Sequence, residues 1–170
     1  CIEPFLGYQD TSGCSQYLQI ESIVSNEYKI LNAFPNEVES YKNGKKKLQG
    51  FFIGWPKSPN AETHLEILQK SYFAWIALHN NSCVGFINAL SDDVFYAHIP
   101  LLEVLPKYQG YGIGTELVKR MLDTLNNMYA IDIICDETLV PFYKGLGLKK
   151  SIGMVSARGH NGSALHWESK

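Results

Sequence analysis

The chain has 170 residues, of which 45% are hydrophobic and 19% charged, and its net charge is −2. This length and composition are typical of one soluble globular domain, and the charge carries no signature of nucleic-acid binding. No stretch is long and apolar enough to span a membrane, and the four cysteines follow no zinc-binding or redox spacing. We therefore expect a cytoplasmic protein with no metal, nucleic-acid or membrane partner.

The first third of the chain carries weak structural signals. Residues 1–17 show little periodicity, and we expect a poorly ordered or strapping N-terminal extension there, ahead of a single domain over residues 18–170. Apolar and polar residues alternate over residues 18–24, which predicts a strand, and residues 27–31 are a second candidate. A short helix is predicted over residues 35–41, with a proline in its first turn.

An aromatic segment over residues 50–56 is bounded by turn-forming residues. Its aromatic side chains suit two roles equally well: they can fill a core, or they can line a binding pocket. After it, Ser58 or Asn60 can cap a helix that runs to about Gln69.

The middle of the chain predicts three strands. Residues 73–78 and 83–90 form a hairpin around a turn at 79–82, and residues 94–105 form a long central strand. Simple alternation along this strand predicts two faces. One face carries Phe95, Ala97, Ile99, Leu101 and Glu103, and the other carries Tyr96, His98, Leu102 and Val104.

A glycine-rich turn follows the central strand, with glycines at positions 110, 112 and 114. The next residues predict an amphipathic helix whose apolar face is formed by Leu117, Val118, Met121, Leu122, Leu125 and Met128. The first amides of a helix have no partners within the helix, and glycines let a phosphate approach them closely. The turn therefore predicts an anion site, although a tight turn without a ligand would look similar.

The common nucleotide loops do not match this turn. The ATP-binding loop needs a lysine after its last glycine, where this chain has Thr115. The dinucleotide fingerprint needs a third glycine at position 115 or 117, and neither position has one. Asp132 and Asp136 lie at about the acidic position of that fingerprint, but only 56 residues follow Gly114 (170 − 114). A nucleotide-cofactor enzyme is therefore disfavoured.

Two motifs resemble those of the GNAT superfamily, the acetyl-CoA-dependent N-acetyltransferases. Gln109-x-x-Gly112-x-Gly114 is similar to that family's pyrophosphate loop. After a strand predicted over residues 131–134, the run from Pro141 to Leu148 resembles the Phe-Tyr-x-x-Leu-Gly-Phe signature. The resemblance implies an α/β fold, with a mixed, mostly antiparallel central sheet and helices on both faces. A helix over residues 139–145 and strands over 148–155 and 164–168 complete the expected order.

The resemblance also implies acetyl-CoA as cosubstrate. The end of the central strand would bind the pantetheine arm, and the loop amides the pyrophosphate. The cofactor-binding residues expected in this way are Leu102, Val104, Leu105, Gln109, Gly110, Tyr111, Gly112, Ile113, Gly114, Thr115, Asp136, Phe142 and Tyr143. Asp136 stands where the family often has an asparagine. A carboxylate there would repel a pyrophosphate, so we expect Asp136 to face a cationic acceptor instead.

The expected reaction is transfer of an acetyl group to a primary amine of a small molecule or peptide, by direct attack. Tyr143 is the expected acid, with packing as its alternative role. Glu103 and His98 are the candidate bases, and water is a third route for the proton. A catalytically idle acyl-CoA-binding regulatory module is the alternative function, and a homodimer that shares the last strand is an open expectation.

Overall fold

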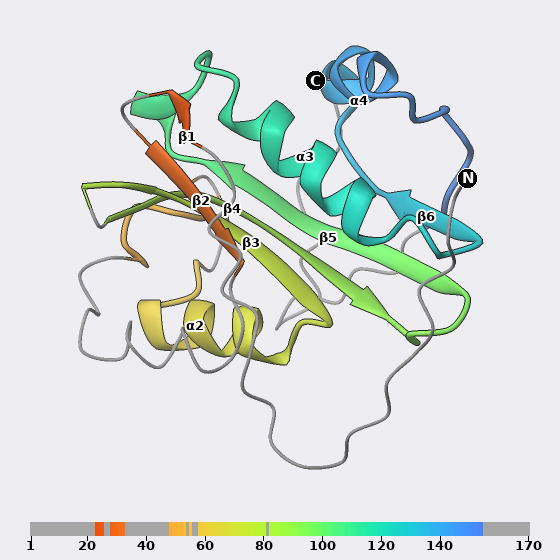
Figure 1. Ribbon diagram of the computed structural model, residues 1–170, viewed down its shortest axis with the longest axis horizontal. Helices are drawn as coiled ribbons and strands as arrows, with labels where there is room; N and C mark the ends of the chain where they lie inside the picture. The colour runs from red at the N-terminus through yellow and green to blue at the C-terminus, as the bar shows by residue number, and fades with distance from the viewer. Residues whose placement is uncertain are drawn as a thin grey trace, which may run out of the picture.

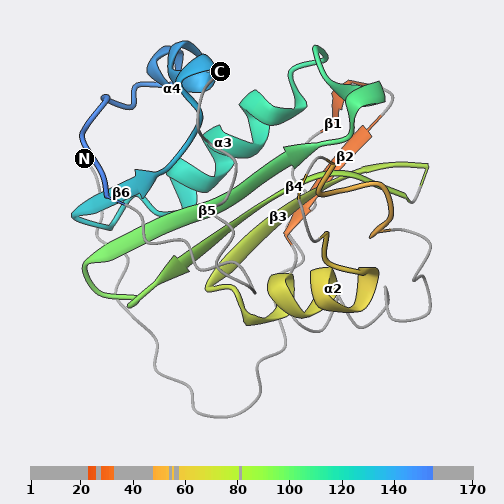
Figure 2. The ribbon, with the colours of Figure 1, turned by 180° about the vertical axis from the view of Figure 1, so that it is seen from behind.

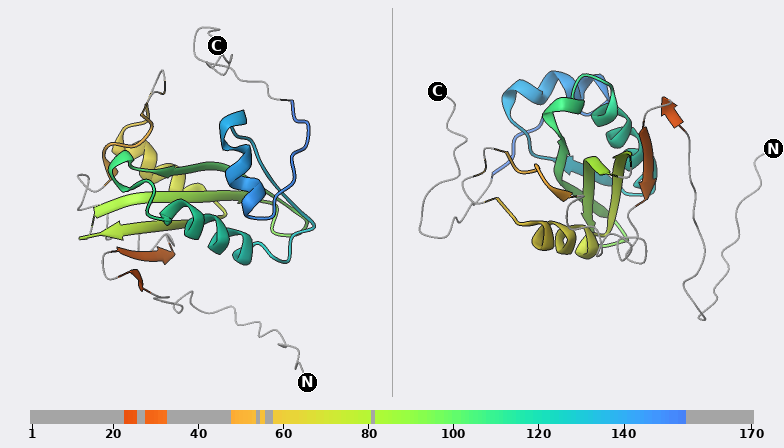
Figure 3. Two further views of the ribbon diagram at one scale, coloured as in Figure 1. Left: turned by 90° about the horizontal axis from the view of Figure 1, so that it is seen from above. Right: turned by 90° about the vertical axis from the view of Figure 1, so that its left-hand side faces the viewer.

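The computed structural model describes residues 23–25, 28–32, 48–53, 55, 58–80 and 82–154. In this part of the chain one six-stranded sheet lies between two helical layers, with α2 on one face and α3 and α4 on the other (Figures 1 and 3). This confirms the predicted α/β class. The elements are β1 (Ile23–Ser25), β2 (Tyr28–Asn32), α2 (Ala61–Lys70), β3 (Phe73–His79), β4 (Ser82–Ser91), β5 (Tyr96–Val104), η2 (Pro106–Tyr108), α3 (Ile113–Thr124), β6 (Ala130–Ile133), η3 (Glu137–Leu139) and α4 (Val140–Gly145).

The strands lie in sequence order across the sheet. Every neighbouring pair from β1 to β5 is antiparallel, and β5 and β6 are parallel. The parallel pair needs a crossover, which α3 supplies. The predicted mixed, mostly antiparallel sheet is therefore confirmed.

Local polar groups determine where two of these elements begin. The Asn60 side chain accepts a hydrogen bond from the Thr63 amide at 2.8 Å, so Asn60, of the two candidates, caps α2. The Asp92 carboxylate accepts hydrogen bonds from the amides of Val94, Phe95 and Tyr96. These bonds close a loop, and β5 therefore starts at Tyr96, two residues later than alternation predicts.

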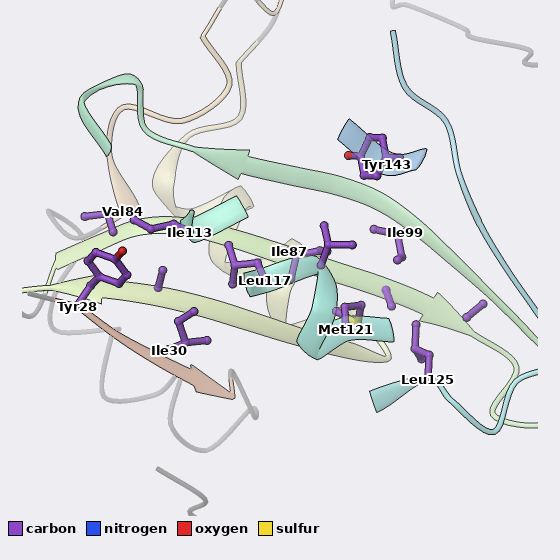
Figure 4. Packing of buried hydrophobic residues seen from close by; sticks show 14 of the residues in the cluster. Tyr28, Ile30, Val84, Ile87, Ile99, Ile113, Leu117, Met121, Leu125 and Tyr143 are labelled. Atoms are coloured by element: carbon purple, nitrogen blue, oxygen red, sulfur yellow. The ribbon is translucent and has the colours of Figure 1, made fainter. Parts of the chain in front are cut away.

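Each face of the sheet has its own hydrophobic core. Between the sheet and α3, Leu117, Met121 and Leu125 are fully buried against Ile87 and Ile99 (Figure 4). This confirms the predicted apolar face of that helix. The second core lies between the sheet and α2, and it contains Leu48, Phe51, Phe52, Leu68, Ala74, Ile76, Leu78, Cys83 and Phe86.

A bulge interrupts β5 at its middle. Leu90 pairs with His98 and Asn88 pairs with Leu101, so a two-residue step on β4 is matched by a three-residue step on β5. The extra residue reverses the alternation of side chains beyond it. Pro100 lies within this step; proline has no amide proton for the ladder and is tolerated at bulges.

The bulge overturns the predicted faces of β5. The residues that face α3 are Ala97, Ile99, Leu102 and Val104. Leu101 packs in the opposite core, and Glu103 bonds to a residue of that core. Glu103 and His98 therefore share the α2-facing side, whereas strict alternation puts them on opposite faces.

The strand predicted over residues 148–155 is wrong for the residues that are described. Residues 148–154 form no strand, and Ile152 and Met154 are almost fully exposed. Apolar residues alone do not make a strand where no neighbouring strand pairs with them. The predicted extension (1–17), helix (35–41) and last strand (164–168) lie outside the described residues, and the domain division stays a prediction. No helix in the described part combines the length and apolar character needed to cross a membrane.

Candidate active site

The glycine loop delivers the N-terminus of α3 to the end of β5. Gly110 and Gly112 have φ values of 81° and 83°, a left-handed conformation that a β-carbon disfavours. Gly112 is the N-cap of α3, so no side chain caps the helix. The amides of Ile113, Gly114 and Thr115 therefore have no partner within the helix and are free to bind an anion.

The two sequence motifs meet at this point. A β-carbon on Gly114 would lie 3.7 Å from Val104 Cγ2 and 3.9 Å from Phe142 Cζ. The end of β5, the start of α3 and the first turn of α4 therefore converge on a residue without a side chain. The structure brings these predicted site residues together.

The two parallel strands part beside the same point. β5 and β6 pair from Tyr96 opposite Ala130 to Ile99 opposite Ile133, where β6 ends, while β5 continues to Val104. The chain after β6 turns away from the sheet toward α4 (Figure 2). Among the described strands, none pairs with residues 100–104 of β5 on this edge. Apart from the Val104 carbonyl, which accepts the Gln109 side chain, the backbone groups of this segment can bind an extended ligand.

Three predicted cofactor-binding residues in and near the loop form hydrogen bonds within the fold. The Gln109 side chain donates a hydrogen bond to the Val104 carbonyl at 2.9 Å and holds the loop against the strand. The Tyr111 carbonyl accepts a hydrogen bond from the Tyr28 hydroxyl at 2.8 Å. The Leu105 amide donates to the Val84 carbonyl at 2.9 Å, so it is already used within the fold.

Tyr143 is buried on α4, beside Phe142, with a distance of 4.9 Å between the ring centroids. Burial raises the pKa of the Tyr143 phenol to about 12, with a smaller contribution from the neighbouring Cys135. The phenol therefore keeps its proton at neutral pH and is available as a hydrogen-bond donor.

Cys135 follows β6 and is a free thiol. Burial raises its pKa, and the charges of Asp136 and Glu137 raise it further. A thiol of this kind stays protonated at neutral pH and is a poor nucleophile. Asp136 itself is exposed, and its carbonyl accepts the Leu139 amide at the start of η3.

The two candidate bases have different partners. The Phe52 N–H donates a bifurcated hydrogen bond that is shared by both carboxylate oxygens of Glu103, with N···O distances of 2.7 and 2.9 Å. Phe52 has a φ of 61°, which is unusual for a residue with a side chain, so Glu103 holds a strained turn in place. His98 instead lies beside Asp132, with 2.6 Å between Nδ1 and Oδ1.

Sequence reasoning missed the contact between Asp132 and His98. Asp132 is the polar residue in an otherwise apolar strand, and His98 is directly opposite it in the parallel register. The available signal was this lone carboxylate between Ile131 and Ile133. The partner of Asp132 depends on the register between β5 and β6, and this register cannot be predicted from the residues near Asp132 in the sequence.

Comparison with known proteins agrees with this geometry. A family model described as an acetyltransferase (GNAT) domain matches residues 49–162. A solved structure from Deinococcus radiodurans R1, provisionally named an acetyltransferase, is 36% identical with a TM-score of 0.71, over 78% of this chain and 90% of that one.

Two curated relatives extend the comparison. A Glycine max protein named histone acetyltransferase TAP1 is 29% identical, over 57% of this chain and 47% of that protein. The ycf52 N-acetyltransferase of Gracilaria tenuistipitata var. liui is 26% identical, over 78% of this chain and 72% of that protein. The chain spans about half the length of the first curated relatives it matches. The match of the family model over most of the chain, together with the glycine loop and the parting strands, shows that the chain belongs to the GNAT acetyltransferase family.

Proposed function

We propose that the protein is an N-acetyltransferase that moves an acetyl group from acetyl-CoA to a primary amine of a small molecule or peptide. The observation that carries this proposal is the edge of β5 that no described strand pairs with, which leads into the N-terminus of α3, where no described side chain forms a cap. An extended arm that ends in a pyrophosphate needs both of these features. Five strand residues provide an edge of roughly 16 Å for such an arm.

The residues fit acetyl-CoA through backbone groups. The amides from Gly110 to Thr115 would hold the pyrophosphate, and the β5 edge at Leu102 and Val104 would hold the pantetheine. Leu105 and Gln109 support this edge through the Val84 carbonyl and the Val104 carbonyl. Phe142 lines the same point from α4.

When bound, acetyl-CoA supplies a thioester whose C–S bond breaks as the amine nitrogen forms the new C–N bond. We assign His98 as the base that accepts the proton lost by the amine. Tyr143 donates a hydrogen bond to the departing sulfur, and Glu103 holds the 48–53 segment. The protonated thiol of Cys135 favours direct attack over an acyl-cysteine intermediate.

The acceptor class rests on the exposed carboxylate of Asp136, which we propose faces a cationic amine. The test of this idea compares the rates for a diamine with those for a monoamine that has no second charged group, in the wild type and in Asp136→Asn. An unchanged preference in the variant would remove it. A cytoplasmic location and a homodimer stay predictions, and one relative is named chloroplastic.

The test of the whole proposal joins binding to turnover. Acetyl-CoA at 100 times its Kd should stabilise the protein by about 2.7 kcal/mol, a Tm rise of roughly 5–10 °C at this size. NAD and ATP serve as controls, and release of the free CoA thiol with a panel of amines measures turnover. Binding without turnover on any amine would favour the idle acyl-CoA-binding module. A Tm rise with NAD alone would contradict the proposal.

A further inference from the structure

His98 and Asp132 form a pair across the parallel strands. They are direct partners in the register of β5 and β6, and 2.6 Å separates His98 Nδ1 from Asp132 Oδ1. An ionised carboxylate only accepts hydrogen bonds, so the proton in this contact belongs to Nδ1. A neutral imidazole with its proton on Nδ1 has its lone pair on Nε2.

The pair lies at the point where the strands part. The rung of His98 and Asp132 is followed by one last rung, at Ile99 and Ile133, before β6 ends. His98 points away from the α3-facing side to which its neighbours Ala97 and Ile99 belong. Tyr143 packs on that α3-facing side. Candidate base and candidate hydrogen-bond donor therefore lie on opposite faces of the sheet.

Asp132 has a second neighbour on the same face. The negative charge of Asp132 raises the pKa of the Tyr96 phenol above its usual value, so the two groups are close. On β4, the residue opposite His98 is the apolar Leu90. Asp132 is thus a charged group in contact with the imidazole, and Tyr96 is a further polar neighbour of Asp132.

The contact between His98 and Asp132 contributes little to the stability of the fold. The two side chains are 35% and 45% exposed, and ion pairs at such positions contribute about 0–1 kcal/mol. A contact of this kind matters more to the orientation of the ring and to which nitrogen carries the proton.

We infer that Asp132 is a positioning residue for His98: it holds the imidazole with its proton on Nδ1, so that Nε2 accepts the proton of the acceptor amine. The imidazolium that forms then lies against the carboxylate, which stabilises it. This inference rests on the proposed function, in which His98 is the base. Removal of the carboxylate should lower turnover without weakening acetyl-CoA binding.

The experiment compares Asp132→Asn with wild type by nitrogen NMR of labelled histidine and by kinetics. We expect a non-protonated Nε2 in wild-type His98, and a changed protonation pattern in the variant. We expect kcat to fall about 10- to 100-fold, with the KM for acetyl-CoA within about twofold. Asp123→Asn, an equal change of charge at an exposed position on α3, is the control and should leave both quantities unchanged.

His98→Gln completes the test. In the double variant, Asp132→Asn should add little to the loss already caused by His98→Gln, because the two residues act as a unit. Independent losses that multiply, a raised KM at unchanged kcat, or an unaltered ring protonation pattern would each overturn the inference. The NMR measurement does not need turnover, so a wild-type protein without activity would defeat the proposed function and still test the pairing.

Discussion

The two faces of the sheet use polar groups in different ways. On the face covered by α3, the interior is mainly aliphatic, and the candidate chemistry comes from backbone amides at the helix N-terminus. On the face covered by α2, polar side chains enter the core itself: His64, Asn88 and Glu103 lie beside aromatic and aliphatic residues. A binding site made of backbone amides depends on the conformation of the chain, and here glycines allow the conformation that the site requires. Polar side chains in a core carry a desolvation cost, so each needs a hydrogen-bond partner, or it lowers the stability of the fold.

The largest expected effect comes from the buried imidazole of His64, whose desolvation lowers stability at acid pH. The centroid of its ring lies 4.4–5.2 Å from the centroids of Phe51, Phe52 and Phe86, and neither ring nitrogen has a hydrogen-bond partner among the described residues. Burial lowers the pKa of His64 from 6.5 to about 4, and the nearby Leu48 backbone offsets only part of this, without forming a bond of normal geometry. The unfolded chain therefore takes up the proton first as the pH falls.

Above pH 6.5 His64 is uncharged in both states, and its protonation does not lower the free energy of unfolding. As the pH falls from 6.5 toward 4, the unfolded chain gains the proton that the folded chain does not bind, and the free energy of unfolding decreases. A shift of about 2.5 pH units corresponds to a full loss of about 3 kcal/mol below pH 4, of which about 2 kcal/mol falls between pH 7 and pH 4.5. Urea unfolding at pH 7 and pH 4.5, on wild type and His64→Leu, measures it. We expect a smaller pH dependence in the variant and equal or greater stability at pH 7. Equal pH dependence in both proteins would mean that His64 is not buried uncharged.

The next effect concerns the partner of Glu103. Glu103→Gln replaces one charge-assisted hydrogen bond, in which the Phe52 N–H is shared between both carboxylate oxygens, with one neutral bond, and should cost about 1 kcal/mol of unfolding free energy. The matched control is Glu66→Gln on α2, whose pair with Lys70 is exposed to solvent, so its loss should leave the unfolding free energy nearly unchanged. Turnover should fall only a few-fold. A variant of normal Tm that has lost turnover would make Glu103 the base and would contradict the assignment to His98.

The backbone site is tested by Gly112→Ala. The left-handed conformation of Gly112 should cost alanine about 1–2 kcal/mol, and the displaced amides should weaken acetyl-CoA binding. Gly145→Ala on α4 is the control, because an added β-carbon would meet no atom of the described residues within 4 Å and the φ of Gly145 is not left-handed. That change should leave stability unchanged or raise it by about 0.4–1 kcal/mol. If both variants bind acetyl-CoA as the wild type does, the loop conformation is not what forms the site.

Much of the fold can be predicted from periodicity. The apolar face of α3 and the hairpin of β3 and β4 follow from residues near one another in sequence. The bulge in β5 reverses two predicted faces, and only Pro100 signals it. The absent strand at 148–154 shows that strand formation depends on a neighbouring strand as well as on local residues.

The candidate site divides in the same way. The glycine loop and Tyr143 belong to local motifs, and they can be recognised without a structure. The partners of Glu103 and His98 lie 51 and 34 residues away in sequence, and strand register and loop placement decide them. Sequence alone therefore leaves both candidate bases open, and their contacts distinguish them.

The smallest expected effect on stability is that of Tyr143→Phe, which removes only the hydroxyl from the α3-facing side. A thiol has a pKa near 8.5, so full proton transfer from a phenol of pKa about 12 is uphill by about 5 kcal/mol. Tyr143 therefore acts as a hydrogen-bond donor, and its loss should lower kcat about tenfold at unchanged Tm. Initial rates across pH 6–10 measure this. A ratio of wild-type to variant rates that changes with pH in this range would show that the phenol ionises there, contrary to its burial.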